Sequence, residues 1–476
     1  MNLVMLVSDT FRWDYLGASG NDWIETPNLD RLAGESVRYT RAFGEGLPTI
    51  QARRVILTGR PIFPFRYRPQ LSDSVQMHGW HPLYDEDVTV AEHLQRHGFV
   101  TCMVTDVYHM MKPGKNFHRG FDCWHWIRGQ ENDAFALRDR KRVADLAARL
   151  PASASPDRVS WIVQHLVNRS QWQSDADTSV GQVGAKAADW IRDYTLDAPF
   201  FIYLDCFDPH EPWDPPLADG RRYKADFNGI DGILPAWEAA ALTDEEFANA
   251  KAAYAGEVTL VDRWIGHVLT ALRETGRYDD TLILFTSDHG TMMGEQGQVH
   301  KREDRLRNQV TRVPLLIRHP DGIGAGQTAD GFVQHQDLVP TLLALLGVEP
   351  DERMTGANVW PVGNTPPERD AIVSGFGHFA SVRTRKWNYV TPWTELPEGR
   401  EPRHELYDLD ADPEELTNVI DRHPDVVQRL RAHLTAHLRT MAPLTDGRFQ
   451  SAAPGSGQMS FDCVPLSGDE DDSAKI

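Results

Sequence analysis

The sequence predicts an α/β fold in which helices cover a large, mostly parallel sheet. Three apolar runs each resemble a buried strand that ends in acidic or histidine side chains. Helical segments, with apolar residues spaced three and four apart, precede the second and third runs. Because the carboxyl ends of parallel strands meet at one edge of a sheet, we expect the polar residues after these runs to form one site.

The three predicted strands are short and almost entirely apolar. They read NLVMLVSD at residues 2–9, PFFIYLDCFDPH at residues 199–210 and TLILFTSDHG at residues 281–290. Continuous apolar runs of this length are typical of strands buried on both faces. The side chains that they deliver at their ends are Asp9, Asp205, Asp208, His210, Asp288 and His289.

Two long helices are predicted before the second and third strands. The segment SVGQVGAKAADWIRDY, residues 179–194, has one apolar face. A second helix follows a capping-box pattern of Thr243 and Glu246 and stops at Gly276. Between about residues 110 and 178 the periodicity is weak, so we expect long loops and short helices over the site there.

The chain changes character after about residue 365, which predicts three parts. Residues 1–365 are expected to form the catalytic domain, and residues 366–445 a small α+β subdomain with a helix from about Pro424 to Met441. Residues 446–476 form an acidic tail rich in small residues, which we expect to be mobile at its end.

Composition excludes several classes of function. The 476 residues carry a formal net charge of −20, which disfavours nucleic acid as a partner. The four cysteines lack CxxC spacing, so neither a zinc knuckle nor a disulfide framework follows. No apolar run reaches the roughly 18 residues that a membrane span needs, and the N-terminus has no basic lead-in. We therefore expect a soluble, cytoplasmic protein without a membrane partner.

Asp9, Asp288 and His289 are the candidate metal ligands. Two carboxylates and an imidazole can bind one divalent cation if their strands are neighbours in the sheet. The histidine nitrogen favours manganese, zinc or iron over calcium or magnesium. The alternative is that the three residues are ordinary strand-end caps.

Thr49 and Arg53 stand at the start of a helix-like segment, PTIQARRVILTGR, residues 48–60. A threonine hydroxyl is a poor nucleophile until a metal or a base removes its proton, and a metal at the first site would do this. Arg53, one turn later, would then hold a tetrahedral oxyanion. The alternative is a helix cap followed by a solvated arginine. We interpret Thr49 as both cap and nucleophile, and as a ligand of the metal.

His210 and Lys301 are the candidate acids and charge stabilisers. His210 lies in a proline-bordered loop, DPHEPWDPP, and Lys301 follows a glycine-rich loop after the metal pair. Either side chain could protonate a leaving oxygen or stabilise the charge of the transferred group. Taken singly, both could also be solvated surface residues.

Seven segments of the sequence together resemble the type I sulfatases, a family of the alkaline phosphatase superfamily, in the family's own order. The resemblance spans residues 2 to about 440 and implies an alkaline phosphatase-like sandwich around the sheet. The segments are TPNLDRLAGESVRYTRAF, PTIQARRVILTGR, DPHEP, FTSDHGTMMGEQG, KRED with RVPLLIRHP, QDLVPTLLALLG and ELYDLDADPEELTN. By their place in the family pattern, Tyr108 and His109 are expected near the substrate.

Several departures from the family pattern point away from sulfate esters. Thr49 replaces the cysteine or serine that sulfatases convert to formylglycine, and Thr10 replaces an acid beside Asp9. His289 replaces an asparagine, and residues 106–109 replace the family's GKWH segment with its lysine. Threonine nucleophiles in the superfamily belong to enzymes of phosphorus esters, and a metal site with histidine resembles that of phosphonate monoester hydrolases.

The resemblance thus implies a metal-dependent hydrolase of phosphodiesters or phosphonate monoesters that forms a phosphothreonine intermediate. Its substrate is a small anionic ester, and its cofactor is one divalent metal, manganese or zinc rather than calcium. Three alternatives remain: a sulfatase without formylglycine, a two-zinc enzyme whose second metal uses His210, Asp205 or His300, and a catalytically silent anion-binding protein. Related phosphonate monoester hydrolases form multimers, so a homo-oligomer is also open.

Overall fold

The computed structural model describes residues 1–67, 69, 75–137, 141, 144, 145, 156–229 and 232–445. Its main element is an eight-stranded sheet. In spatial order the strands are β13 (Thr328–Ala329), β2 (Val37–Tyr39), β12 (Leu315–Arg318), β8 (Thr281–Ser287), β1 (Asn2–Ser8), β7 (Phe200–Cys206), β5 (Val100–Thr105) and β6 (Cys123–Trp126).

The centre of this sheet is parallel, as the sequence predicts. Strand β1 lies between β7 and β8 and is parallel to both, and β5 is parallel to β7 and β6. Strand β12 is antiparallel to both of its neighbours. In this register Ser8 is opposite Cys206 on one side and Ser287 on the other. The three predicted strands are therefore adjacent, and their polar ends lie at one edge.

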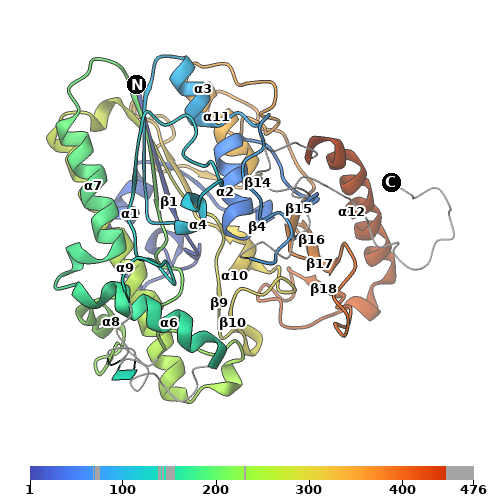
Figure 1. Ribbon diagram of the computed structural model, residues 1–476. Coiled ribbons are helices and arrows are strands. Elements are labelled where there is room, and N and C mark those ends of the chain that lie inside the picture. Colours follow the sequence, from blue (N-terminus) through green and yellow to red (C-terminus); the bar gives the residue numbers. More distant parts are fainter. Residues whose placement is uncertain are drawn as a thin grey trace.

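Helices cover both faces of the sheet (Figure 1). The first face packs on α1 (Pro27–Gly34), α7 (Ser179–Asp193) and α9 (Asp244–Glu274). The second packs on α2 (Thr49–Thr58), α3 (Val90–Arg96) and α11 (Leu338–Leu346). Alternate residues of β1 enter the two cores: Val4 and Leu6 enter the first core, and Leu3, Met5 and Val7 enter the second. This burial on both faces is why the strand is a continuous apolar run.

The two long predicted helices are confirmed. Helix α7 begins after the cap Thr178, and α9 begins after Thr243, whose hydroxyl accepts the backbone N–H of Glu246 in a capping box. Helix α9 runs for 31 residues and ends at Glu274 with Thr275 as its C-cap, beside the predicted stop at Gly276. Its buried face packs against α1, α7 and α8 (Leu217–Tyr223).

The stretch from residue 110 to 178 contains more regular structure than loops and short helices. It holds the edge strand β6 and a 13-residue helix, α6 (Pro156–Asn168). Strand β6 reads CWHW, has no apolar–polar alternation and is half-exposed, so the periodicity that predicts strands is absent from it. A shorter helix, α4 (Tyr108–Met111), lies before it at the carboxyl end of β5.

A second sheet and a long helix form the C-terminal part (Figure 1). The sheet contains β18 (Glu405–Asp408), β17 (Trp387–Pro392), β16 (Phe379–Thr384), β15 (Ala371–Phe376) and β4 (Gly46–Leu47). Helix α12 (Pro424–Thr445) packs on it and extends four residues beyond the predicted end at Met441. Strand β4 reaches this sheet from the N-terminal part, directly before Thr49. The predicted tail, residues 446–476, lies outside the described residues.

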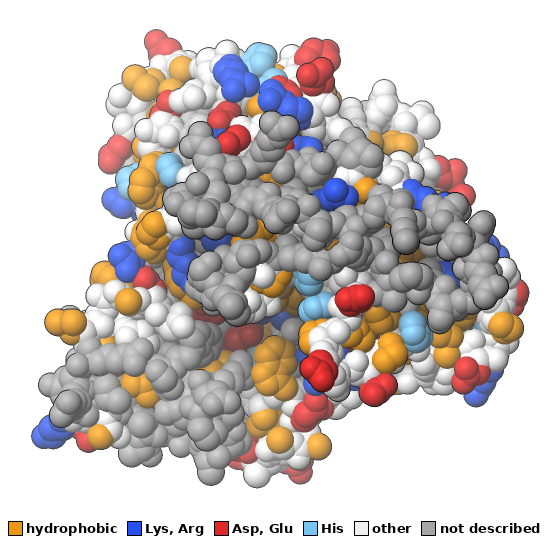
Figure 2. Space-filling view, turned by 45° about the vertical axis from the view of Figure 1, so that its right-hand side comes forward, with side chains coloured by type: hydrophobic (Ala, Val, Ile, Leu, Met, Phe, Trp, Pro, Cys, Tyr) orange, Lys and Arg blue, Asp and Glu red, His pale blue; other side chains and the backbone are white. Residues whose placement is uncertain are grey.

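Short elements complete the fold. They are the ribbon of β9 (Met292–Met293) with β10 (Val299–His300), the small sheet of β11 (Arg312–Val313), β3 (Ala42–Phe43) and β14 (Val333–Gln334), and the helix α10 (Asn308–Thr311). On the face in Figure 2, acidic and basic side chains are interspersed among apolar ones. Among the described residues, no helix combines the length and apolarity that a bilayer crossing requires.

Candidate active site

The edge formed by the carboxyl ends of β1 and β8 brings Asp9, Asp288 and His289 together. Their ligand atoms lie within 4.8 Å of one another, and all three side chains are fully buried. The Nε2 atom of His289 lies 3.4 Å from Asp288 Oδ2 and 3.7 Å from Asp9 Oδ1. Two carboxylates and one imidazole nitrogen thus face a common point, as the strand ends predict.

The state of His289 fits a metal ligand. Its Nδ1 lies 2.9 Å from the carbonyl oxygen of Gly290, so Nδ1 donates the proton and Nε2 keeps its lone pair. This Nε2 is buried without a hydrogen-bond partner. Burial lowers the pKa of His289 to about 3, so the ring is neutral. A buried lone pair that faces two carboxylates is the arrangement that a divalent cation completes.

Arg53 occupies the centre of the acidic cluster. Its Nη1 donates to Asp9 at 2.9 Å and to Asp288 at 2.6 Å, and its Nε and Nη2 form a fork with both oxygens of Asp205 at 2.8 Å. All four side chains have no exposed surface. In this structure Arg53 therefore braces the metal-binding carboxylates, a contact that the sequence does not indicate.

The two carboxylates of the candidate metal site, Asp9 and Asp288, differ in proton affinity. Burial raises the pKa of Asp9, but the surrounding cations, Arg53 foremost, outweigh it and hold that pKa well below its usual range. Burial and then the charge of Asp9 raise the pKa of Asp288 to about 7. Asp9 is thus charged throughout the neutral pH range, whereas Asp288 needs a further cation nearby to remain charged.

Thr10 fixes the orientation of both carboxylates. Its hydroxyl donates to Asp9 at 2.6 Å, and its backbone N–H donates to Asp288 at 2.9 Å. The residue adopts a φ of 62°, which is strained for a β-branched side chain. Thr10 replaces an acid of the family pattern, and here it acts as a hydrogen-bond donor to the remaining ligands.

Thr49 is the first residue of α2 and not its cap. The N-cap is Pro48, whose carbonyl accepts the N–H of Ala52 at 2.9 Å, and this described helix end has no side-chain cap. The prediction that the Thr49 hydroxyl caps the helix is therefore wrong, because the helix begins one residue earlier than a cap at Thr49 requires. The carbonyl of Thr49 accepts from Arg53 Nη1 at 3.3 Å, which ties the helix start to the acidic cluster.

His210 and Lys301 form a contact pair at the same edge. Lys301 Nζ lies 2.6 Å from His210 Nε2, and His210 Nδ1 lies 2.5 Å from the carbonyl oxygen of Glu211. Nδ1 therefore carries the proton, and Nε2 accepts one from the ammonium. The carboxylate of Glu211 lies 3.3 Å from Lys301, and the positive charge of Lys301 also acts on Asp9. The structure thus brings together the two predicted acids.

A buried carboxylate, Glu131, links the predicted substrate residues to this pair. Glu131 lies 3.0 Å from His109 Nε2 and 3.9 Å from His210 Nδ1. The Tyr108 ring is tilted by 38° against that of His109, with ring centres 4.0 Å apart, and its hydroxyl donates to Asn132 at 2.7 Å. Glu131 has a φ of 46°, and its surrounding segment has weak periodicity, so no sequence signal marks it.

Two further buried acids lie behind the site. The amide of Gln130 donates to Asp106 at 3.0 Å and to Asp208 at 2.8 Å. Burial raises the pKa of Asp208 to about 6, and burial with the charge of Asp208 raises that of Asp106 further. The pair therefore retains a proton near neutral pH, which keeps this side of the site from accumulating negative charge.

The residues named for a second metal do not converge. Among the described residues, the close groups of three metal-binding side chains are the cluster above and one at Cys102, Cys123 and His125. Asp205 is held by Arg53, His210 contacts Lys301, and His300 Nε2 lies 2.8 Å from the carbonyl oxygen of Pro235. A single metal site at the strand ends is the arrangement that these positions favour.

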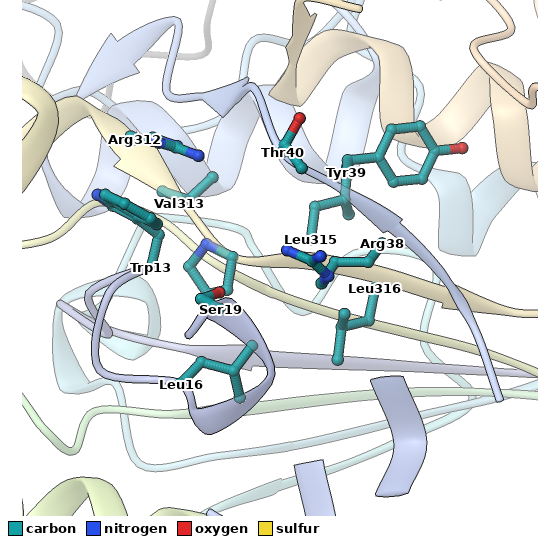
Figure 3. Close-up of a pocket in the computed structure, with 11 residues that line it drawn as sticks. Trp13, Leu16, Ser19, Arg38, Tyr39, Thr40, Arg312, Val313, Leu315 and Leu316 are labelled. Atoms are coloured by element: carbon teal, nitrogen blue, oxygen red, sulfur yellow. The ribbon is translucent and has the colours of Figure 1, made fainter. Parts of the chain in front are cut away.

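Two pockets of the described surface lie apart from this cluster. In the first, Figure 3 shows Trp13 and Leu16 facing residues of β2, β11 and β12, with the Arg312 guanidinium 3.5 Å from the centre of the Trp13 ring. The second, of about 270 Å³, is lined by Trp126, Phe135 and Trp172 among others. Neither pocket includes a predicted site residue.

Sequence comparison relates the chain to sulfate ester hydrolases. A sulfatase sequence model matches residues 1–348, and one described as N-sulphoglucosamine sulphohydrolase, C-terminal, matches residues 294–442. An arylsulfatase of Clostridium perfringens is 27% identical over 468 residues, which cover 88% of this chain and 90% of that protein.

Comparison with solved structures finds proteins that have the same fold as this chain. The phosphonate monoester hydrolase of Agrobacterium radiobacter superposes with a TM-score of 0.68 at 24% identity, covering 92% of this chain and 95% of that one. BT4656 in complex with its substrate D-glucosamine-2-N,6-O-disulfate has the same TM-score at 19% identity, covering 93% of this chain and 98% of that one. These likenesses, with the sheet order above, confirm the predicted alkaline phosphatase-like architecture.

Proposed function

Because this chain belongs to the sulfatase family, we propose that it is a metal-dependent hydrolase of phosphodiesters or phosphonate monoesters in which Thr49 is the nucleophile. One observation carries the proposal: Thr49 occupies the first position of α2, and Arg53 ties that position to the metal-competent cluster. A hydrolase of this superfamily is the coarser statement, and the family match supports it.

The metal site consists of Asp9, Asp288 and His289, with Thr49 proposed as a further ligand. The two oxygens and one nitrogen suit manganese or zinc better than calcium. When bound there, a divalent cation supplies Lewis-acid activation of a hydroxyl. Arg53 and Thr10 keep the carboxylates in place before any cation or substrate arrives, so the site needs little rearrangement on binding.

The chemistry then follows from the chain's own residues. The Thr49 hydroxyl releases its proton to solvent, and its oxygen forms a bond to phosphorus in line with the departing alcohol, whose bond to phosphorus breaks. The alcohol takes a proton from the Lys301–His210 pair, in which the ammonium and the imidazole share a hydrogen bond. The pair that protonates this alcohol regains its proton from solvent. Water next attacks phosphothreonine, releases the phosphorus acid and returns a proton to Thr49. Lys301 also stabilises the negative charge of the transferred group.

The threonine argues for phosphorus over sulfur. A formylglycine diol releases sulfate by collapse of a hemiacetal, whereas a threonine ester has no such exit and needs water to attack the central atom. The comparisons favour a sulfate ester as the substrate, because an arylsulfatase is among the relatives. A sulfatase that works without formylglycine is therefore the second candidate, and a silent anion-binding protein is the third.

Initial rates on p-nitrophenyl esters distinguish the three candidates. The substrates are a phosphate diester, a phenylphosphonate, a phosphate monoester and a sulfate, each with manganese or zinc supplied. Rates led by the diester or the phosphonate support the proposal, and rates led by sulfate favour the second candidate. No turnover of any ester, with retained anion binding, favours the third.

The variant Thr49→Ala tests the nucleophile itself. We expect a loss of at least about a thousandfold in kcat with an unchanged melting temperature, because the hydroxyl does not cap α2. The matched control is Thr58→Ala at the other end of α2, whose hydroxyl bonds only locally, to Arg54 and Arg60. Retained turnover in Thr49→Ala would refute the assignment.

A further inference from the structure

A second group of metal-binding side chains lies in the main sheet, away from the catalytic residues. Cys102 and Cys123 are opposite each other in the parallel pair β5 and β6, and His125 lies two residues after Cys123. Residues two apart in a strand share a face, so the three side chains lie on one face of the sheet edge. Their sulfur and nitrogen atoms lie within 4.8 Å of one another.

We propose that Cys102, Cys123 and His125 bind a zinc-type cation that fastens the edge strand β6 to β5. Two thiolates and one imidazole are the donors that zinc selects over magnesium or calcium. Ligands at zinc–sulfur and zinc–nitrogen distances are about 3.5–3.8 Å apart in a tetrahedron. The observed spread therefore needs a shift of only about 1 Å to reach that geometry, and a water molecule takes the fourth position.

The surroundings prepare two of the three ligands. The indole N–H of Trp190, on α7, donates to Cys123 Sγ at 3.2 Å. This donated N–H favours the thiolate form of Cys123, which is the form that coordinates zinc. His125 is half-buried, so its imidazole is accessible to an incoming cation. Binding releases the remaining thiol proton to solvent.

The location gives the cation a structural role and a route of entry. Cys102 is fully buried in the core under α7, whereas Cys123 and His125 are half-buried on the last strand of the sheet. In the described part of the chain β6 pairs with β5 alone, so each added link between the two strands protects an edge that otherwise depends on one ladder of hydrogen bonds. The cation stabilises the folded chain through its binding free energy.

The test is a cadmium titration of the full chain, reduced and then freed of metal by a chelator. Cadmium reports thiolate ligation through an ultraviolet charge-transfer band that the oxygen-rich catalytic site does not produce. We expect a saturable band at one equivalent in the wild-type chain, and zinc should compete it away. The variant Cys123→Ser should lose the band, and His125→Gln, a change at a half-buried position, should weaken binding at least about tenfold.

The control is Cys463→Ser, which removes a thiol far along the chain and should keep the band. Loss of the cadmium band in Cys463→Ser, or persistence of the band in Cys123→Ser, would overturn the proposal. Intact thiols that give no cadmium band would also overturn it, because the cysteines would then only pack together. A Cys102–Cys123 disulfide found by peptide mass spectrometry, with no metal binding after reduction, would overturn it as well.

Discussion

The strand-end cluster of Asp9, Asp288 and His289 and the mid-strand cluster of Cys102, Cys123 and His125 lie in the same sheet but are built differently. The first is held by Arg53 and by Thr10, and its imidazole nitrogen is a buried lone pair. The second is approached by the Trp190 N–H. The difference teaches that charge compensation prepares a reactive site, whereas local packing suffices for a structural one.

The variant Asp288→Asn tests most sharply whether the two clusters act independently. We expect a loss of at least about a thousandfold in kcat, because the change removes one of the proposed metal ligands. The cadmium–thiolate band should remain, since the second cluster shares no residue with the first. The matched control is Asp22→Asn at an exposed position, which should change neither. Loss of the band in Asp288→Asn would contradict the independence of the clusters.

Arg53→Met tests whether the arginine and the metal share the same carboxylates. Removing one partner of a buried ion pair costs about 3–5 kcal/mol, and here it leaves three buried carboxylates together. We expect a large drop in the free energy of unfolding in urea with a chelator present. Saturating manganese should reduce this drop, because the cation compensates Asp9 and Asp288. Equal losses with and without metal would show that the two do not share ligands.

Glu45 provides a buried carboxylate that is held by backbone groups. It accepts the backbone N–H groups of Ile62 and Phe63, and burial raises its pKa to about 7. Because the folded-state pKa lies above the unfolded value, the stabilisation is full below about pH 4.5 and is lost as the pH rises through 7. The expected contribution is about 3 kcal/mol between these limits.

In the variant Glu45→Gln this pH-dependent contribution to the free energy of unfolding should disappear. Urea unfolding of both chains between pH 4.5 and 8.5 measures it, with saturating manganese so that the metal ligands stay occupied. The stability of the variant relative to the wild-type chain should increase with pH. A constant difference across this range would show that Glu45 titrates normally in the folded chain.

Glu131→Gln tests the connection between His109 and His210. We expect kcat to fall about tenfold, since the glutamine keeps the shape but loses the charge that orients two imidazoles. The cadmium band and manganese affinity should not change. Glu352→Gln, at an exposed position, is the matched control. An unchanged kcat and pH profile in Glu131→Gln would leave the carboxylate with a packing role.

Sequence reasoning could place the strand-end cluster for a physical reason. A buried parallel strand is a continuous apolar run, and the first polar residue after it must lie at the sheet edge. This argument places Asp9, Asp288 and His289 correctly in one group. The capping box of α9 was equally visible, because Thr243 and Glu246 interact within one turn.

The remaining contacts are long-range and leave no local pattern. Arg53 meets Asp205, and Glu131 meets His210, across separations of 152 and 79 positions in the chain. The spacing of Cys102 and Cys123 along the chain has no metal-binding pattern, whereas the register of β5 and β6 brings the two residues together in space. The prediction that Thr49 caps α2 is wrong by one residue, because backbone geometry sets the residue at which a helix starts.

Strand β4 pairs with β15 just before Thr49, so the proposed nucleophile follows a strand of a sheet whose other strands come from the last quarter of the chain. A ribosome has therefore released almost the whole polypeptide before that position acquires its support. The candidate site is consequently completed late in synthesis, and we expect a truncation at the C-terminal end to disturb a residue encoded near the beginning of the gene.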